Sequence, residues 1–260
     1  MHAHRRAARR LTGALALTLP ALLAACTADP PSPAPTGTAD PVPAEVDAAR
    51  DELAALAAAA QDRHLTATYT FEPADGAART VAVTSANDGT WRVDVPGWGQ
   101  GGTVDVSLAA NADGLFQCAL PSAGWAQQAG CVRLGDADDA VPRRLDPRVQ
   151  HPFTDWLEVL TDRRAPLAVS PAAPLPGVSG ECYSVESTSA SLNAPLDVGI
   201  YCYRPDGTPA AVRAAFGTLK LAGEPGAAPA TVQLAGPVTE GEPVSRDAPS
   251  PSDSPSTGTP

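Results

Sequence analysis

The sequence predicts an α+β fold in which one antiparallel sheet is covered by a few helices. Three observations lead to this class. An alanine-rich helical stretch opens the folded part of the chain. Beyond it, apolar residues recur with a period of two over many short segments. Asp88-Gly89, Asp113-Gly114 and Asp206-Gly207 separate segments of this kind, and Asp-Gly pairs are typical of the tight turns that join antiparallel strands.

The first 25 residues predict an export signal. The basic stretch MHAHRRAARR precedes the apolar run LTGALALTLPALLAA. This run is too short to span a bilayer, because spanning takes about 20 apolar residues. It ends in Leu23-Ala24-Ala25-Cys26, which resembles the bacterial lipobox, the signal that directs lipid attachment to a cysteine.

The lipobox resemblance implies that residues 1–25 are a lipoprotein signal peptide and that the Cys26 sulfur carries a diacylglyceryl group. We expect the acylated protein to be anchored at the extracytoplasmic face of the cell membrane, because two acyl chains suffice for stable anchoring. A plain secretory signal that happens to end in a cysteine is the alternative.

Both ends of the mature chain have the composition of disordered segments. Residues 26–43 contain many prolines and no apolar periodicity, which predicts an extended tether after the acylated cysteine. Residues 241–260 are rich in Pro, Ser, Gly and acidic residues, which predicts a disordered tail. The region between them, 44–240, has the size of one ordinary domain.

The charge of the chain excludes one class of partner. Lys and Arg number 18 and Asp and Glu number 29, a net charge of −11. The leader holds four arginines and no acidic residue, so its removal takes the net charge to −15. We therefore expect no nucleic-acid partner, because nucleic-acid binding needs a basic surface.

Two helices are predicted. Residues 44–62 are dominated by alanine, carry acidic side chains in the first half, and place Val46, Leu53 and Leu56 on a modest apolar stripe. A second helix is predicted in HPFTDWLEVLTDRR (151–164), where Pro152 suits the first helical turn and Trp156 belongs to the apolar face.

The strands follow from alternation and turn signals. Asp88-Gly89, Asp113-Gly114 and Asp206-Gly207 each predict a hairpin turn. The predicted strands lie in LTATYTFE (65–72), RTVAVTSANDGTWRVDV (79–95), TVDVSLAANADGLFQCAL (103–120), ECYSVES (181–187), VGIYCYRPDGTPAAVR (198–213), FGTLKLAG (216–223) and ATVQLAG (230–236).

Four cysteines remain if Cys26 is acylated. Export makes disulfides the default, and four cysteines allow three pairings. We expect Cys118–Cys131 and Cys182–Cys202, because each pair flanks one predicted hairpin or two adjacent strands. A redox or metal site is the alternative, but the sequence contains no C-x-x-C and no histidine at zinc spacing from a cysteine.

No motif predicts catalysis, a cofactor or a metal. The mature chain has two histidines, His64 and His151, and neither lies in a recognised catalytic motif. GDADDA (135–140) has only part of the spacing of a calcium loop, so we interpret it as a solvated acidic loop. GWGQGG (97–102) predicts a flexible connection between strands, or a wide loop over a cavity mouth. We expect a protein that is not an enzyme.

The order of these features resembles the LolA/LolB and LppX/LprG group of bacterial lipoproteins, in particular those of mycobacteria and related actinobacteria. The residues that carry the resemblance are the lipobox around Cys26, the helix 44–62 running into LTATYTFE, the segment TSANDGTWRVDV and the DWLEVLTDR helix. The resemblance implies a strongly curved sheet, a half-barrel closed by helices, whose concave face encloses an apolar cavity.

Two functions follow from this resemblance and from the alternatives that the sequence leaves open. The first is a membrane-anchored envelope lipoprotein that binds or carries a lipid, a lipoglycan or another hydrophobic molecule in the half-barrel. The second is a non-catalytic interaction or scaffold lipoprotein with a filled core, because a fold alone does not determine function. For the first function, the residues expected to line the cavity are the aromatic side chains of Tyr69, Phe71, Trp91, Phe116 and Trp156.

Overall fold

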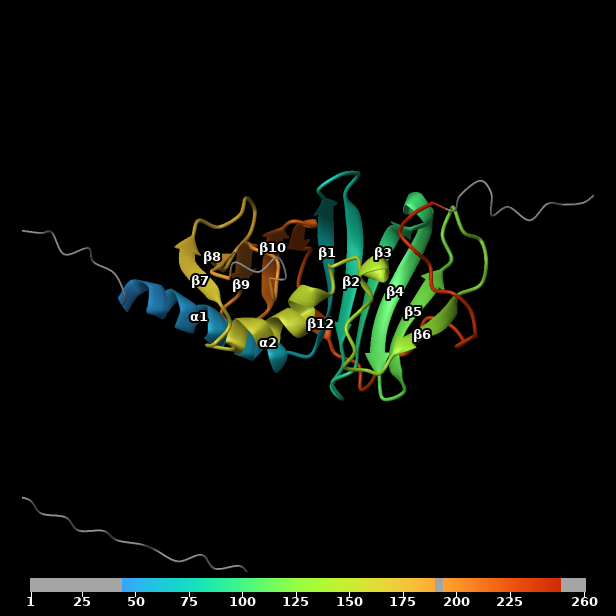
Figure 1. Cartoon of the computed structure of the whole chain (residues 1–260), viewed down its shortest axis with the longest axis horizontal. Helices are drawn as coiled ribbons and strands as arrows, with labels where there is room; N and C mark the ends of the chain where they lie inside the picture. Colours follow the sequence, from blue (N-terminus) through green and yellow to red (C-terminus); the bar gives the residue numbers. More distant parts are fainter. Residues whose placement is uncertain (1–43, 190–193, 249–260) are drawn as a thin grey trace, which may run out of the picture. The chain divides into compact units, whose positions relative to one another are not determined.

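The structure is a computed structural model that describes residues 44–189 and 194–248 (Figure 1). These residues belong to one compact unit, Val42–Pro260. The expected signal peptide, the acylation site Cys26, the tether 26–43 and residues 249–260 all lie outside the described residues.

The described part of the chain contains two α-helices and three short 3-10 helices. They are α1 (Ala44–Gln61), η1 (Gln100–Gly102), η2 (Arg143–Leu145), η3 (His151–Phe153) and α2 (Asp155–Thr161). Both predicted helices are therefore confirmed. The second is shorter than expected, and its N-terminal turn, around Pro152, is a separate 3-10 helix.

The strands of the described residues form one sheet. They are β1 (Leu65–Pro73), β2 (Arg79–Ser85), β3 (Trp91–Gly99), β4 (Val104–Asn111), β5 (Gly114–Leu120), β6 (Gly130–Gly135), β7 (Leu167–Ala172), β8 (Glu181–Ser187), β9 (Gly199–Tyr203), β10 (Pro209–Ala214), β11 (Gly217–Leu221) and β12 (Gly226–Ala227).

The sheet is built from two meanders that meet at β1. Strands β1 to β6 step outward to one edge, the segment with η2, η3 and α2 crosses to the other edge, and β7 to β11 step back until β11 pairs with β1 (Figure 1). All pairings between named strands are antiparallel, and the predicted α+β class is confirmed as an open sheet with two α-helices.

The three predicted Asp-Gly turns join β2 to β3, β4 to β5 and β9 to β10. Gly89 and Gly207 have φ values of +83° and +82°. Only glycine adopts this left-handed backbone without strain, which explains why a glycine follows the aspartate at these turns.

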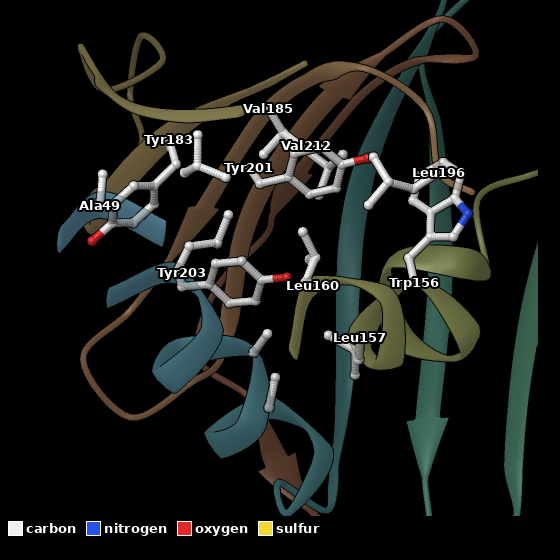
Figure 2. Close-up of a cluster of buried hydrophobic side chains, with 14 residues drawn as sticks. Ala49, Trp156, Leu157, Leu160, Tyr183, Val185, Leu196, Tyr201, Tyr203 and Val212 are labelled. Carbon is white, nitrogen blue, oxygen red and sulfur yellow. The ribbon is translucent and has the colours of Figure 1, made fainter. Parts of the chain in front are cut away.

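Helices α1, α2, η2 and η3 pack on one face of the sheet. We call this face the helix face. The pairing registers of the strands place Tyr69, Val93 and Tyr201 on it. Over strands β7 to β10, α1 buries Ala49, Leu53 and Ala57 against a layer that includes three tyrosines, Tyr183, Tyr201 and Tyr203 (Figure 2). Small alanine side chains let the helix approach the large rings closely, so the alanine-rich sequence suits this layer.

A second core covers the helix face over strands β1 to β5. It contains alternate residues of β1 (Leu65, Ala67, Tyr69 and Phe71) together with valines of the next three strands. Phe216 packs against both cores, and Phe153 of η3 lies 4.8 Å from the Tyr69 ring, centroid to centroid. The helix face is therefore filled by side chains along most of its length.

The C-terminal part of the described chain corrects two expectations. Residues 230–236 are not a strand, and residues 241–248 are not a disordered tail. Instead, residues 228–248, which we call the strap, are held by backbone hydrogen bonds to the β2–β3 turn, to β6 and to η1. The composition of this segment favours disorder, but these tertiary hydrogen bonds and buried apolar contacts order it.

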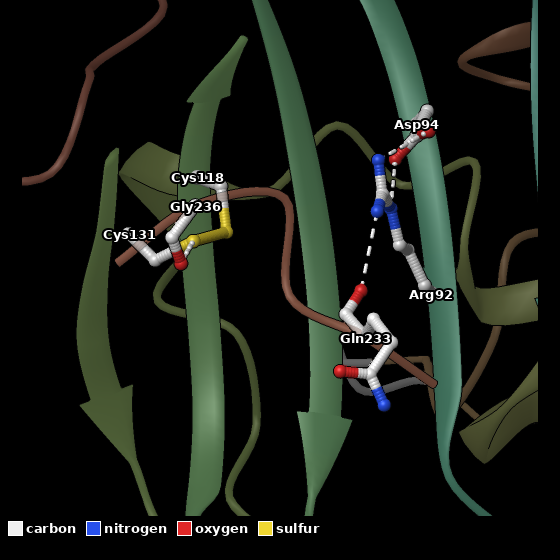
Figure 3. Close-up of a disulfide and its surroundings, with 6 residues drawn as sticks. All are labelled: Arg92, Asp94, Cys118, Cys131, Gln233 and Gly236. Atoms are coloured by element: carbon white, nitrogen blue, oxygen red, sulfur yellow. Dashed lines mark hydrogen bonds and ion pairs between the residues drawn. A yellow bond between two sulfur atoms is a disulfide. The ribbon is translucent and has the colours of Figure 1, made fainter. Parts of the chain in front are cut away.

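The strap passes from one face of the sheet to the other around the β6 edge. On the outer face, Val232 packs against Ala109, and Arg92 donates a hydrogen bond to the Gln233 carbonyl at 3.2 Å (Figure 3). Val238 forms a parallel bridge with Cys131, which covers part of an otherwise open sheet edge. On the helix face, the buried Gln117 side chain exchanges two hydrogen bonds with the backbone of Val244.

Both predicted disulfides are confirmed, Cys118–Cys131 and Cys182–Cys202. Each joins residues that lie directly opposite one another on neighbouring strands. The first lies under the strap, where the Gly236 carbonyl is 3.4 Å from the Cys131 sulfur (Figure 3). Each closes a short loop and is expected to contribute about 3 kcal/mol to stability.

Because the strap is part of the fold, substitutions of its buried residues should lower the free energy of unfolding. Val244→Ala removes apolar contacts with Gly99 and with the second core, so we expect a loss of about 1 kcal/mol in the free energy of unfolding. The matched control is Val238→Ala, because Val238 is 52 % exposed and should cost much less. Urea denaturation measures both, and equal losses would contradict the packed position of Val244.

Candidate functional site

A groove of about 510 Å³ opens on the helix face and is the candidate functional site. It is lined by the C-terminal end of α1 and the residues that follow it (60–64), the start of β1, the adjoining ends of β2 and β3, the loop 137–141 and the segment 150–158. Its size lies within the usual range for small-molecule pockets, about 300–1,000 Å³.

The groove exists because the crossing segment between the two meanders bridges the sheet here without filling it. Leu65, Val83 and Trp91 present apolar side chains from three neighbouring strands, which their period-two alternation places on the helix face. Phe153 and Leu157 of the crossing segment form part of the opposite wall. The base of the groove is therefore apolar, while its rim carries charged residues of the two loops.

A histidine between two carboxylates organises the crossing segment. The His151 ring donates from Nε2 to Asp146 at 2.9 Å and from Nδ1 to Asp155 at 2.6 Å. Burial acts to lower the pKa of His151, but the hydrogen bonds to both aspartates outweigh it and raise this pKa to about 9. Burial also disfavours the Asp146 anion, yet the His151 hydrogen bond holds the Asp146 carboxyl pKa below its usual value.

This arrangement assigns His151 a structural role. A catalytic base needs a ring nitrogen that is free to accept a proton, and both nitrogens of His151 already donate to carboxylates. The imidazolium instead ties the loop before η3 to the first turn of α2. The same ring stacks on Trp156 with centroids 5.0 Å apart, so the ion pairs also position the central tryptophan of the core.

Gln150 presents an unusual buried acceptor at the groove. Gln150 is one of the residues that line the groove, and it is 1 % exposed. Its Nε2 donates to Asp146 Oδ1 at 2.7 Å, which fixes the orientation of the amide, because a carboxylate accepts hydrogen bonds and cannot face the amide oxygen. Oε1 is buried and has no hydrogen-bond partner among the described residues.

The structure separates the aromatic residues that the sequence suggested as cavity-lining. Tyr69, Phe71 and Trp156 lie in the packed cores of the helix face. Phe116 is buried and pairs with Ala109, a residue of the outer face. Of the five, only Trp91 lines the groove.

Other residues that line or adjoin the groove were not singled out from the sequence. Gln150, Asp146 and Phe153 gain their importance from contacts across turns and strands. One local signal was available: His151 and Asp155 stand four residues apart, a spacing that brings side chains together on a helical turn. The acidic loop 135–140, interpreted as solvated, supplies the exposed groove residues Asp138 and Asp139.

Within the described residues, no cluster of three or more His, Cys, Asp or Glu side chains has the arrangement of a metal site. Within the same residues, no helix is both long and apolar enough to cross a membrane.

Comparisons with known proteins do not indicate a function, so the site is interpreted from its geometry. The chain matches no protein-family model, and the comparison with curated proteins finds no match.

Proposed function

We propose that this protein is a membrane-anchored envelope lipoprotein whose domain binds a small amphipathic molecule in the groove on the helix face. The groove itself carries the proposal: about 510 Å³, with Leu65, Val83 and Trp91 at its base and charged side chains at its rim. Such a combination suits a ligand with one apolar part and one polar part. The diacylglyceryl group on Cys26 holds the domain at the extracytoplasmic face of the membrane.

The proposal modifies the role that the resemblance to the LolA/LolB and LppX/LprG group implies. In that group a half-barrel encloses a long apolar cavity. Here the aromatic side chains expected in such a cavity are largely buried in the core, and a compact groove remains. This supports binding of a compact amphipathic molecule over enclosure of long acyl chains, and we propose no enzymatic step because His151 has no free ring nitrogen.

Binding is tested with the full chain carrying Cys26→Ser, expressed in its own host and examined by native mass spectrometry. We expect a co-purified small molecule of defined mass. Ala140→Trp should abolish this added mass, because Ala140 is exposed at the rim and an indole there fills the groove without disturbing the core. Ala77→Trp is the matched control, since Ala77 is exposed in the β1–β2 turn and outside the groove.

A protein of bare mass in every variant would reject the groove as a binding site. It would favour the alternative function, an interaction lipoprotein without a ligand. A ligand that survives Ala140→Trp would place the binding site elsewhere.

Anchoring is tested separately by cell fractionation. Wild-type protein should remain with the membrane fraction, and Cys26→Ser should move to the soluble fraction, because the substitution removes the acylated sulfur. A Cys118→Ser, Cys131→Ser double variant is the control for loss of thiols as such and should stay with the membrane. Membrane retention of Cys26→Ser would reject the lipid anchor.

A further inference from the structure

We infer that the groove selects an organic cation, an ammonium or guanidinium group attached to an apolar body. This inference rests on the proposed function and names the chemical class of its ligand. Four features of the groove support it: an excess of unpaired carboxylates, neutralised positive side chains, the C-terminal end of a helix, and the buried unpartnered oxygen of Gln150.

The unpaired charges at the rim are negative. Asp138 and Glu158 line the groove from opposite segments, are exposed, and have no side-chain partner among the described residues. Asp139 also lines the groove, and one of its oxygens accepts a hydrogen bond from the Asp136 backbone at 2.8 Å. The groove therefore has three carboxylates that are not paired with any positive side chain of the described residues.

Two basic side chains of the groove, Arg63 and His151, are already paired with carboxylates. Arg63 pairs with Asp206 at 2.7 Å, outside the groove lining. The His151 imidazolium lies between Asp146 and Asp155, so these three groups together carry a net negative charge. An anionic ligand would therefore meet repulsion, and a cationic ligand would meet uncompensated carboxylates.

The end of α1 adds to this negative potential. Ala60 and Gln61, at its C-terminus, line the groove. The last carbonyl groups of a helix carry a partial negative charge, and the last turn of α1 contains no basic residue that would offset it.

The Gln150 amide provides a specific requirement beyond charge. Gln150 lines the groove, its orphaned Oε1 is a buried acceptor, and an unmade hydrogen bond at such an acceptor is costly. Ammonium and guanidinium groups donate hydrogen bonds and accept none, so they satisfy this oxygen where a carboxylate or phosphate would not. Trp91 supplies an aromatic surface on which such a cation or its apolar body packs.

The test compares three probes that share one apolar body. Titration calorimetry with the full Cys26→Ser chain uses 2-phenylethylammonium, 2-phenylethanol and 3-phenylpropionate. We expect the ammonium probe to bind at least tenfold more tightly than the alcohol, and the carboxylate to show no binding. Raising the salt concentration from 0.1 M to 1 M should weaken ammonium binding, because screening acts on the rim carboxylates.

The variants assign the selectivity to the rim. Asp138→Asn with Glu158→Gln should weaken ammonium binding at least fivefold and leave binding of the alcohol unchanged. The matched control, Asp75→Asn with Glu186→Gln, makes the same change of charge at exposed positions outside the groove and should have no such effect.

The outcomes separate this inference from the proposed function. Equal binding of the alcohol, preference for the carboxylate, or an unchanged affinity in the Asp138, Glu158 variant would overturn the cation inference. In each of those cases the groove would still bind an amphipathic ligand. If none of the three probes binds but Ala140→Trp displaces a host ligand, the cation inference is overturned and the proposed function stands. If Ala140→Trp displaces no ligand at all, both the cation inference and the proposed function are overturned.

Discussion

Trp156→Ala is expected to reduce the free energy of unfolding by about 3–5 kcal/mol. Trp156 is 2 % exposed and lies in α2, where it points into the buried cluster on the helix face (Figure 2). Its ring stacks on His151, and it lies 6.1 Å from the Tyr201 ring and 6.0 Å from the Phe216 ring, centroid to centroid. Phe216 packs against both hydrophobic cores, so the cavity left by the indole weakens the contact between the two meanders.

Urea denaturation measures this loss, with Trp91→Ala as the matched control. Trp91 lines the groove and is only partly buried, so the same truncation there should cost less than half as much. Trp156→Phe should recover part of the loss, because a ring remains for stacking. A loss from Trp156→Ala no larger than that from Trp91→Ala would contradict the central position of Trp156.

The stability of the fold is expected to decline on the alkaline side of neutrality because of His151. Its pKa is about 9 in the folded protein, against an ordinary value of 6.5. Below pH 6.5 the ring is charged in both the folded and unfolded states, and the stabilisation is fully present. Between pH 6.5 and about 9 only the folded protein retains the proton, so stability falls as pH rises.

The size of this effect follows from the shift. One pKa unit corresponds to about 1.4 kcal/mol, so raising the pH through this range should remove on the order of 3 kcal/mol. The charged groups facing the site are Asp146, Asp155, Arg148 and Asp197. Burial raises the pKa of the core tyrosines, which keeps them from contributing.

Two measurements check the alkaline decline. Denaturation midpoints from pH 6 to pH 9.5 should fall for the wild type, and NMR titration of the His151 ring should give its pKa directly. Asp155→Asn should lower that pKa and flatten the pH profile, because it removes one of the two ion pairs. His64→Asn is the control for the other histidine of the mature chain and should leave the slope unchanged. A pH profile that is flat in the wild type would contradict the doubly paired imidazolium.

Part of the site could be predicted from the sequence, and the rest depended on contacts distant along the chain. Trp91 lies on an alternating strand, which predicts its inward face without further information. Gln150 gives no signal in the sequence, because its significance depends on Asp146 orienting the amide and on a groove formed by four other segments. The strap was missed because proline-rich composition describes local preference and not the Gln117 side chain that binds its backbone.

The sequence by itself determined the features that arise between near neighbours. Alanine content set α1, Asp-Gly pairs set three hairpins, and two cysteine pairs on adjacent strands set both disulfides. Tertiary structure alone decided that β11 pairs with β1, that the strap encircles the β6 edge, and that a groove remains on the helix face. The physical reason is that propensity and periodicity act over a few residues, whereas strand order and cavities arise when side chains distant in the chain pack together.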